Sequence, residues 1–435
     1  MFDSNEFEEV TIGRESLVPW PRIAAVAAMV GFSLPTFLTG LEVSIAMAPW
    51  EAVGALVLGS LIIFAIGGVI GMIGARTRMS SYLLIRLAFG DAGAGLVNIA
   101  FAISLLGWFG ININLFTQAM GRLALTLFDV QLPEIAMAAT AGVCMTLTTL
   151  VGFRAINWLS TVMVPVLAFV TIWLITSALG EKSFGAIMAE PSVPSAAEPS
   201  LTIGSGVSAI VGAIIVGAII LPDITRFART TGGAVGTAFI AYVPIQILVM
   251  GAAGLAGSLA PNSEFLDILI DLGLGLGAII IVIASSWALN SLNLYSTVLS
   301  VKATFPSLNR TFLTIGLGAL GVSFALLNIL DSFVTFLIYL SAIFVPVAGV
   351  LVADYLAVRP GHYALRNLNK GPAINANAFI AWLIGAGFAI GEIQGWVGSP
   401  SGFPALESMV LTGATYLALT AVRRGRNPLT EAVGE

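Results

Sequence analysis

Three amides share a helical stretch with a tryptophan, in surroundings that are otherwise apolar. In "SLLGWFGININLFTQ", residues 104–118, Trp108 and Asn112 are four residues apart, so both project from one face of a helix. Asn114 and Gln118 share a neighbouring face. An amide in hydrocarbon costs several kcal/mol unless it is hydrogen-bonded. These side chains therefore either line a functional site or hydrogen-bond to neighbouring helices.

A second polar stripe lies further along the chain. In "IASSWALNSLNLYST", residues 283–297, spacings of four, three and four separate Ser286, Asn290, Asn293 and Thr297. These spacings give one continuous face of a helix. We expect that face to turn toward the protein interior or a water-filled path, with helix packing as the alternative.

Two apolar stretches contain residues that break helices. The first holds "GFSLPTFLTG", residues 31–40, and the second "GAIIVGAIILPD", residues 212–223. The second stretch contributes Gly212, Gly217 and Pro222. Matched breaks would expose backbone groups to a ligand or ion at membrane mid-depth, which is tolerated only where the backbone is buried in protein or lines a cavity. The alternative for the first is a proline kink whose freed carbonyl is satisfied by Ser33 or Thr36.

Carboxylates are rare within the apolar stretches. Glu42 is the most conspicuous, and an intramembrane carboxylate is by default a functional candidate. Glu42 could exchange a proton, or it could simply reach the outer interface. Asp223 and Asp354 each lie near an arginine at the end of an apolar stretch, so we expect local ion pairing or helix termination for both.

No residue pattern predicts catalysis or a resident metal. His362 is the only histidine and Cys144 the only cysteine, and neither lies at a metal-ligand or nucleophile–base spacing. No glycine-rich phosphate loop occurs. The sequence therefore predicts neither an enzyme nor an ATP-driven pump, and it predicts no cofactor.

The elements that position these residues must lie in a membrane. The 435 residues are 58% hydrophobic and 9% charged, with a mean hydropathy of +0.99, whereas soluble domains hold about 25% charged residues. A net charge of −5 without a basic cluster argues against nucleic acid as a partner. The acidic N-terminus lacks the features of a signal peptide, and we expect it to be a cytoplasmic tail.

Twelve apolar segments are long enough to cross a bilayer, which takes about 20 helical residues. They are residues 22–46, 52–75, 93–127, 132–152, 156–179, 201–222, 234–259, 271–304, 312–329, 332–357, 376–394 and 404–422. With the N-terminus inside, all of the 18 Lys and Arg residues except Arg122 and Lys182 fall on the cytoplasmic side.

A loop rich in proline and serine divides the first ten spans into two sets of five with opposite orientations. The predicted organisation is a tail at 1–21, a first repeat at 22–180, a second at 200–358, two further helices at 372–423, and a tail at 424–435. Opposed halves with matched helix breaks are typical of inverted-repeat transporters. We therefore expect an all-α integral membrane protein that moves a solute.

Several segments resemble one family, the cytosine/purine, uracil, thiamine and allantoin permeases, or nucleobase–cation symporters. In chain order they are "GARTRMSSYLLIRLAFG", "GWFG", "PDITRF", "LNLYS" and "LSAIFVPVAGVLVADYLAVRPGHY". The nearest resemblance is to bacterial cytosine permeases. It implies a leucine-transporter-like fold of two inverted five-helix halves and two extra helices. It also implies a nucleobase held between the first, third, sixth and eighth spans, with Trp108 stacking on the ring and backbone near Gly212 contacting it.

Three departures from the family pattern stand out. Leu105 occupies the place of a glutamine that reads the base edge, and Ile214 that of a ring-sandwiching aromatic residue. Ser285 replaces an asparagine, while Ala288 and Leu289 replace the two hydroxyl residues that help to hold sodium. A hard cation needs oxygen ligands, so the resemblance leaves the coupling ion open between H⁺ and Na⁺.

The sequence thus predicts a permease that imports a nucleobase or a similar small planar heterocycle, such as cytosine or a purine, by cation symport with alternating access. The expected site comprises Trp108, side chains of Asn112, Ser285, Ser286 and Asn290, and backbone near Ser33, Thr36, Gly212 and Gly217. Glu42 is the candidate for ion coupling. A passive facilitator or channel is the alternative.

We expect the protein to act as a monomer in the inner membrane, with both termini cytoplasmic. Its expected partners are the lipid bilayer and a small-molecule substrate.

Overall fold

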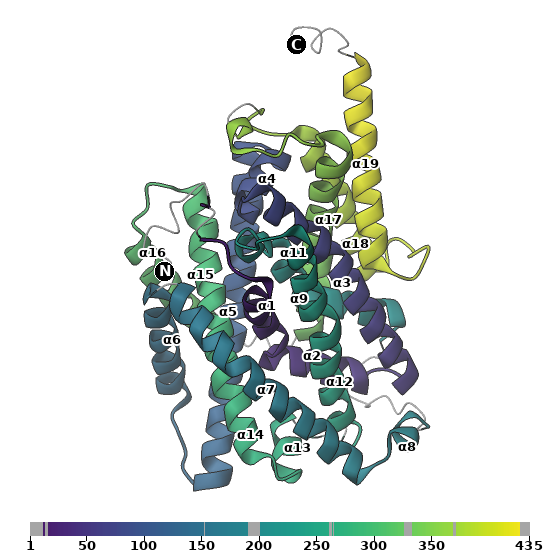
Figure 1. Ribbon diagram of the computed structural model, residues 1–435. Helices are drawn as coiled ribbons and strands as arrows, with labels where there is room; N and C mark the ends of the chain where they lie inside the picture. Colours follow the sequence, from purple (N-terminus) through teal and green to yellow (C-terminus); the bar gives the residue numbers. More distant parts are fainter. Residues whose placement is uncertain are drawn as a thin grey trace.

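The chain is helical almost throughout the residues that the structure describes. It is a computed structural model that describes residues 12–13, 16–151, 153–189, 201–260, 263, 265–325, 333–368 and 371–426. The only β pairing in those ranges is an isolated parallel bridge between Val18 and Ala228. The predicted all-α class is confirmed (Figure 1).

The described helices follow one another in chain order. They are α1 (Trp20–Gly31), α2 (Leu34–Ile45), α3 (Pro49–Thr77), α4 (Ser81–Phe89), α5 (Asp91–Phe128), α6 (Glu134–Val151), α7 (Phe153–Glu181), α8 (Phe184–Met188), α9 (Ile203–Ile219), α10 (Pro222–Thr225), α11 (Thr231–Ile240), η2 (Ala241–Ile245), α12 (Gln246–Gly257), α13 (Phe265–Asp271), α14 (Gly275–Ile280), η3 (Ile281–Ser285), α15 (Ser286–Thr304), α16 (Arg310–Phe324), α17 (Phe333–Ala353), η6 (Asp354–Val358), η7 (Leu365–Asn367), α18 (Ala376–Ile393) and α19 (Pro404–Arg426).

Most of the expected spans are present as long apolar helices. Within the described ranges, ten helices are long and apolar enough to cross a membrane, and α1 with α2 forms an eleventh span that is bent by 53°. The segment expected at 312–329 corresponds to α16, which has only 15 residues. Residues 326–332 lie outside the described part. The count of twelve is therefore not confirmed by length and composition.

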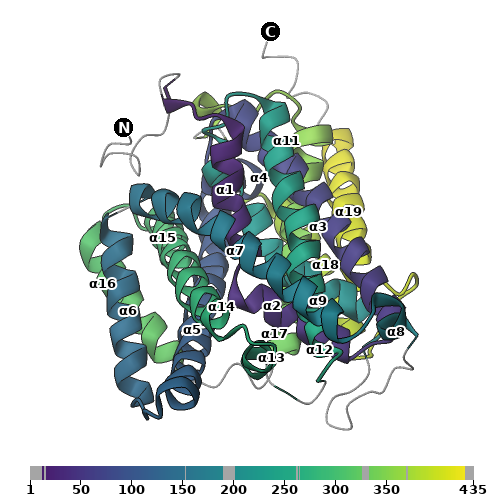
Figure 2. The same cartoon turned by 60° about the horizontal axis from the view of Figure 1, so that its bottom comes forward.

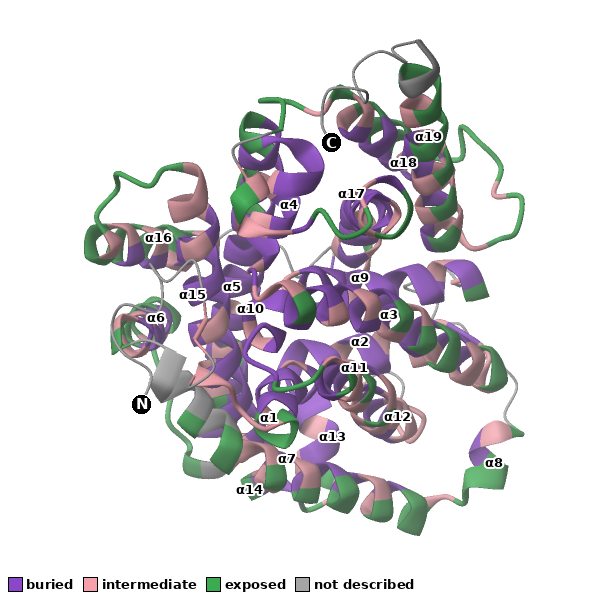
Figure 3. Cartoon of the chain, turned by 45° about the horizontal axis from the view of Figure 1, so that its top comes forward, coloured by how far each residue is buried: buried purple, intermediate pink, exposed green. Residues whose placement is uncertain are grey.

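The core lies at the centre of the bundle, where burial is greatest (Figure 3). The most apolar windows of α5 and α9 are each 72% buried, whereas that of α19 is 22% buried. α19 and α6, at the periphery, carry exposed apolar side chains such as Val410 and Leu147. Apolar faces without protein partners suit contact with lipid.

α9 packs against α17 so closely that only glycine fits at the contact. A Cβ on Gly212 would collide with the main-chain carbonyl of Leu337 in α17. α9 runs from Ile203 to Ile219 without interruption, and the chain leaves the helix only at Ile220, just before α10. The sixth span is therefore interrupted within the expected stretch 212–223, at Ile220 and Leu221, and not at Gly212, which serves close helix packing.

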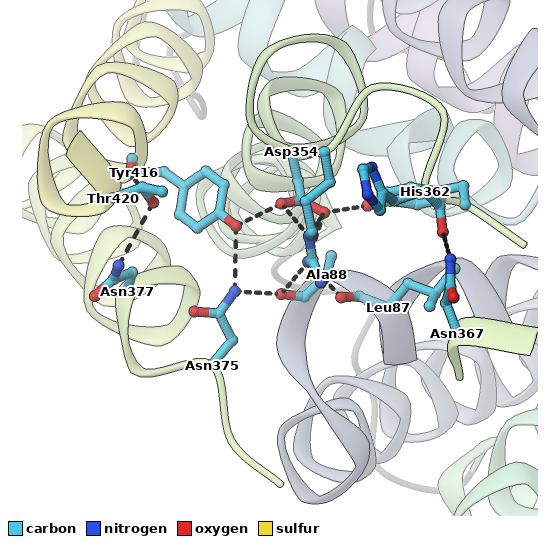
Figure 4. A network of polar contacts seen from close by, with 11 residues as sticks. Leu87, Ala88, Asp354, His362, Asn367, Asn375, Asn377, Tyr416 and Thr420 are labelled. Atoms are coloured by element: carbon cyan, nitrogen blue, oxygen red, sulfur yellow. Dashed lines mark hydrogen bonds and ion pairs between the residues drawn. The ribbon is translucent and has the colours of Figure 1, made fainter. Parts of the chain in front are cut away.

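A polar network fastens α17 to α4 and α19 at one end of the bundle (Figure 4). The buried carboxylate of Asp354 accepts hydrogen bonds from Arg359, from Tyr363 at 2.6 Å and from Tyr416 at 2.5 Å. Arg359 also donates to the carbonyl of Leu87 in α4. Burial lowers the pKa of Arg359, but the Asp354 carboxylate more than reverses this, so the pKa is raised. The expected local ion pair of Asp354 is confirmed.

The bundle has two ends, which we call the inner end and the outer end. The inner end holds α4 and the start of α1, and the sequence predicts that it faces the cytoplasm. The outer end holds α8 and α13. Figure 2 shows α4 and α11 at one end of the molecule and α8 and α13 at the other.

Replacing Gly212 with alanine should destabilise the fold by about 1–3 kcal/mol, because the new methyl group overpacks the contact between α9 and α17. Gly217→Ala is the matched control, since the nearest atom to its added Cβ would be Val30 Cγ1 at 3.8 Å. Thermal unfolding of the purified protein in detergent measures both variants. Equal melting temperatures for the two would contradict the packing role of Gly212.

Candidate functional site

The first span breaks between α1 and α2, where the sequence expected it to. Ser33 has an extended backbone, with φ −94° and ψ 151°, and α2 starts at the next residue. The hydroxyl of Thr36 donates to the carbonyl of Val30 at 3.2 Å, and the Ser33 and Thr36 hydroxyls are 2.8 Å apart. Because the Thr36 hydrogen is used on Val30, Ser33 is the donor in the second bond. The alternative prediction, that Ser33 or Thr36 satisfies the carbonyl freed at the break, is thus confirmed for Thr36 and the Val30 carbonyl. The helix is broken there and not merely kinked.

A central cavity lies at this break. It holds about 550 Å³ of space free of protein atoms, open solvent included. Val30, Ser33, Pro35 and Thr36 line it from both sides of the break. The helices α5, α9 and α15 supply the other walls. The break therefore opens onto a space between four spans, which are the first, third, sixth and eighth in chain order.

Trp108 forms part of the cavity wall from α5. Its side chain is 7% exposed, and its ring meets the rings of Phe333 and Phe336 in edge-to-face contacts, with centroids 6.2 and 5.4 Å apart. Such contacts add about 0.5–1.5 kcal/mol each beyond area burial. They fix the orientation of the indole before any solute binds.

Four of the expected site residues line the central cavity, namely Trp108, Ser33, Thr36 and Gly217. Gly217 comes from α9, and a Cβ added there would meet only Val30 Cγ1, at 3.8 Å. Leu105 and Ile214, which depart from the family pattern, line the same cavity. The apolar residues at these two positions therefore make the walls apolar where the family pattern has an amide and an aromatic ring.

Asn112 and Asn290 lie behind the cavity wall and hydrogen-bond to the main chain of α5. Both are fully buried. Asn112 Nδ2 donates to the carbonyl of Trp108 at 2.8 Å, and Asn290 Nδ2 donates to that of Phe109 at 3.0 Å. Asn290 thereby joins α15 to α5, which is the helix-packing role that the sequence left open.

The remaining expected residues also lie outside the cavity lining. Ser285 and Ser286 are fully buried, and Ser285 donates to the carbonyl of Ile281 one turn earlier. Gly212 faces the main chain of α17. Ser286 Oγ has no hydrogen-bond partner in the described ranges. These three residues thus pack within the protein around the site.

Asn293 is the polar residue of α15 that lines the central cavity, and it was not among the expected site residues. Its side chain is 8% exposed, and Nδ2 has no hydrogen-bond partner among the residues described. The stripe of residues 286–297 contained the signal. All four residues of the stripe lie in α15. The periodicity gave their common side of the helix but not the position along it that lies at the depth of the cavity.

The structure assigns no coupling ion. Leu289 lines the central cavity and Ala288 is buried, so neither side chain offers an oxygen there. Glu42 is half-buried on α2, three residues before the helix ends at Ile45. Among the described residues, no group of three or more His, Cys, Asp or Glu side chains could hold a metal ion.

A larger cavity occupies the outer end above the break. It holds about 1240 Å³ of open space and is lined by Leu34 and Leu38 of α2, among others. An ion pair between Arg122 of α5 and Asp267 of α13 borders it. The first turn of α2 therefore separates an outer vestibule from the central cavity.

Comparisons with known proteins agree with this arrangement. The family model described as "Permease for cytosine/purines, uracil, thiamine, allantoin" matches residues 26–415. The chain is similar to a cytosine permease of Escherichia coli (strain K12), at 31% identity over 310 residues, which is 70% of each chain. It is also similar to an allantoin permease of Bacillus subtilis (strain 168), at 23% identity over 88% of this chain and 86% of the relative.

A solved structure has the same fold. It is that of MHP1, a nucleobase-cation-symport-1 family transporter, in a closed conformation with bromovinylhydantoin bound. The TM-score is 0.82 at 16% identity, and the match covers 97% of this chain and 96% of that one. The transporter fold expected from the sequence is therefore confirmed.

Thr36→Val should lower the free energy of unfolding by about 1–3 kcal/mol, because it leaves the buried Val30 carbonyl and Ser33 hydroxyl without their partner. Thr36→Ser keeps the hydroxyl and should remain closer to the wild type. Thermal unfolding without added solute measures both. If the valine variant melted at the wild-type temperature, the bridging role of Thr36 would be wrong.

Proposed function

The chain belongs to the family of permeases for cytosine/purines, uracil, thiamine and allantoin, and on that premise we propose that it imports a nucleobase or a similar small planar heterocycle by cation symport. Members of this family are permeases, and the chain is accordingly a multi-pass membrane transporter and not an enzyme. The proposal adds the class of solute, the direction and the coupling to a cation, H⁺ or Na⁺.

One observation carries the proposal, namely the cavity at the helix break with an indole fixed in its wall. The cavity lies between four spans, and residues from both sides of the helix break line it together with Trp108. The walls are mainly apolar, with Trp108 on one side and few polar groups. A flat ring that stacks on an aromatic side chain gains about 1–3 kcal/mol. The cavity therefore suits a planar heterocycle better than a sugar or an ion.

The polar groups of the cavity would select the edge of the ring. The unpartnered Nδ2 of Asn293 could donate a hydrogen bond to a carbonyl or ring nitrogen of the solute. Ser33 and Thr36 present hydroxyl oxygens at the break. With Leu105 in place of a glutamine, the amide for edge recognition would come from α15 instead of α5.

The expected residues outside the lining take a supporting role in this proposal. Asn112 and Asn290 hold the main chain beside Trp108 and Phe109, while Ser285, Ser286 and Gly212 pack around the site. A site held by buried partners of this kind is rigid before the solute arrives. Backbone near Gly217 remains the contact that α9 would supply.

In this proposal, H⁺ or Na⁺ crosses the membrane inward together with the solute. Glu42 is the candidate on the outer half of the first span. The proposed orientation places the inner end in the cytoplasm and the protein in the inner membrane as a monomer, with both termini cytoplasmic.

Proteoliposomes distinguish the symporter from a passive facilitator, because only coupled transport can concentrate solute. Uptake of radiolabelled cytosine, adenine, allantoin and hydantoin is measured under an imposed pH gradient, an imposed sodium gradient, or neither. We expect at least one of the four to accumulate above its external concentration under one gradient. Mere equilibration of a transported solute under every gradient would favour the facilitator instead.

Trp108→Ala should weaken solute binding about 5- to 150-fold, which corresponds to the loss of about 1–3 kcal/mol of stacking. Trp108→Phe keeps an aromatic face and should lose less. The dissociation constants come from isothermal titration of the accumulated solute into purified protein. Normal affinity in the alanine variant would count against a site at this ring.

A further inference from the structure

A third cavity continues the central one toward the inner end. It holds about 470 Å³ of open space, and Val30, Gly217, Ile220 and Leu292 line both cavities. Beyond these shared residues it extends to Asp223 of α10. A solute or ion that leaves the central cavity for the inner end can therefore meet Asp223.

The Asp223 carboxylate is buried and only half hydrogen-bonded. The residue is 9% exposed. Oδ1 accepts from the main-chain nitrogen of Ser81 at 2.8 Å and from its hydroxyl at 2.9 Å. Oδ2 has no hydrogen-bond partner in the described part of the chain. A buried charge is costly unless it is paired, so burial favours the neutral form of this carboxylate, whereas the nearby Arg226, Ser81 and Tyr82 favour the charged form.

The nearby arginines are turned to main-chain oxygens instead of the carboxylate. Arg226 Nε donates to the carbonyl oxygen of Asp223 itself at 3.3 Å, and its guanidinium carbon lies 5.0 Å from the Phe227 ring centroid. Arg78 donates to the carbonyls of Arg226, at 2.7 Å, and Ala228, at 2.5 Å. Thus the expected ion pair of Asp223 with Arg226 is absent from the described contacts, unlike that of Asp354 with Arg359.

The other ionisable groups that face Asp223 are tyrosines. Tyr82 of α4 donates its hydroxyl to the carbonyl of Ser296 at 2.9 Å. Burial raises the pKa of Tyr82 well above its usual value, and the Asp223 carboxylate raises it further. Tyr242 and Tyr295 also line the cavity. Among the described residues that line this cavity, Asp223 is the only carboxylate, and the cation that acts on it, Arg226, lies outside the lining.

We propose that Asp223 takes up the coupling proton at Oδ2 and releases it to the inner side during each transport cycle. This inference rests on the proposed function and names its ion. Protonation converts the carboxylate to a neutral acid, and release restores the charge, so no other reactant is needed. A sodium ion would need several oxygen ligands, whereas this cavity is mostly apolar. Glu42 on the outer half of the first span could not by itself deliver a proton to the inner side.

Asp223→Asn tests the proposal, because the amide oxygen can still accept from Ser81 while the titratable group is lost. An inside-alkaline gradient of about one pH unit can drive about tenfold accumulation when one proton moves with each solute. We expect the wild type to accumulate the transported test solute and to acidify the vesicle lumen, reported by an entrapped pH dye. The asparagine variant should exchange labelled for unlabelled solute but show neither accumulation nor acidification. Asp271→Asn, at an exposed site on the outer end, is the matched control and should behave as the wild type.

Ser81→Ala tests the proposal through the pH dependence of uptake, which would not change if Asp223 had only a structural role. It removes a hydrogen bond that favours the charged carboxylate, so protonation should occur at higher pH. The midpoint of the pH dependence of uptake should therefore shift upward. An unchanged midpoint in an active Ser81→Ala variant would contradict the proposal.

The other outcomes also decide between the proposals. Accumulation and acidification by Asp223→Asn at the wild-type level would overturn the role of Asp223. If that variant lost exchange too, Asp223→Glu would decide, since a restored carboxyl must restore driven accumulation and its failure to do so would reject the proposal. Accumulation by the wild type under a sodium gradient alone would reject the proton but keep the proposed function. Absence of exchange with all four test solutes would instead remove the proposed function.

Discussion

The structure depends on the rule that a polar group within hydrocarbon must find its partner inside the protein. The first span breaks, and the carbonyl that the break frees at Val30 receives the Thr36 hydroxyl, which in turn accepts from Ser33. This local chain of two hydroxyls makes the break stable without water. It also places the two hydroxyl oxygens at the wall of the central cavity. The same two hydrogen bonds therefore stabilise the break and shape the site.

The sixth span stays helical past both Gly212 and Gly217 and is interrupted only at Ile220 and Leu221. α9 supplies glycine where α17 approaches, at Gly212, and again where the cavity needs room, at Gly217. Opposite it, Phe333 and Phe336 hold Trp108 from the side of α17. The cavity thus lies between the broken first span and helices that pack closely against one another. Further cavities on both sides make a series from the outer vestibule to Asp223.

The sequence predicted the features that local pattern determines and missed those that depend on packing. Hydropathy predicted the membrane spans, and Pro35 with its neighbours predicted the break between α1 and α2. The prediction for Gly212 was wrong, because a glycine that kinks a helix and one that admits another backbone look alike in sequence. Asn293 was passed over in favour of Ser286 and Asn290, since a sequence does not show which turn of α15 lies at the depth of the cavity. The supporting roles of buried amides depend on partners that are far away in the chain.

The central claim is that a flat solute binds at the break of the first span against Trp108. A cryo-electron microscopy structure of the protein with the transported solute bound tests this most directly. We expect density for the solute between the α1–α2 break and the indole of Trp108, within about 4 Å of the ring. Asn293 should lie at the edge of the solute. Density at another place, with the central cavity empty or the first span continuous through residues 31–34, would contradict it.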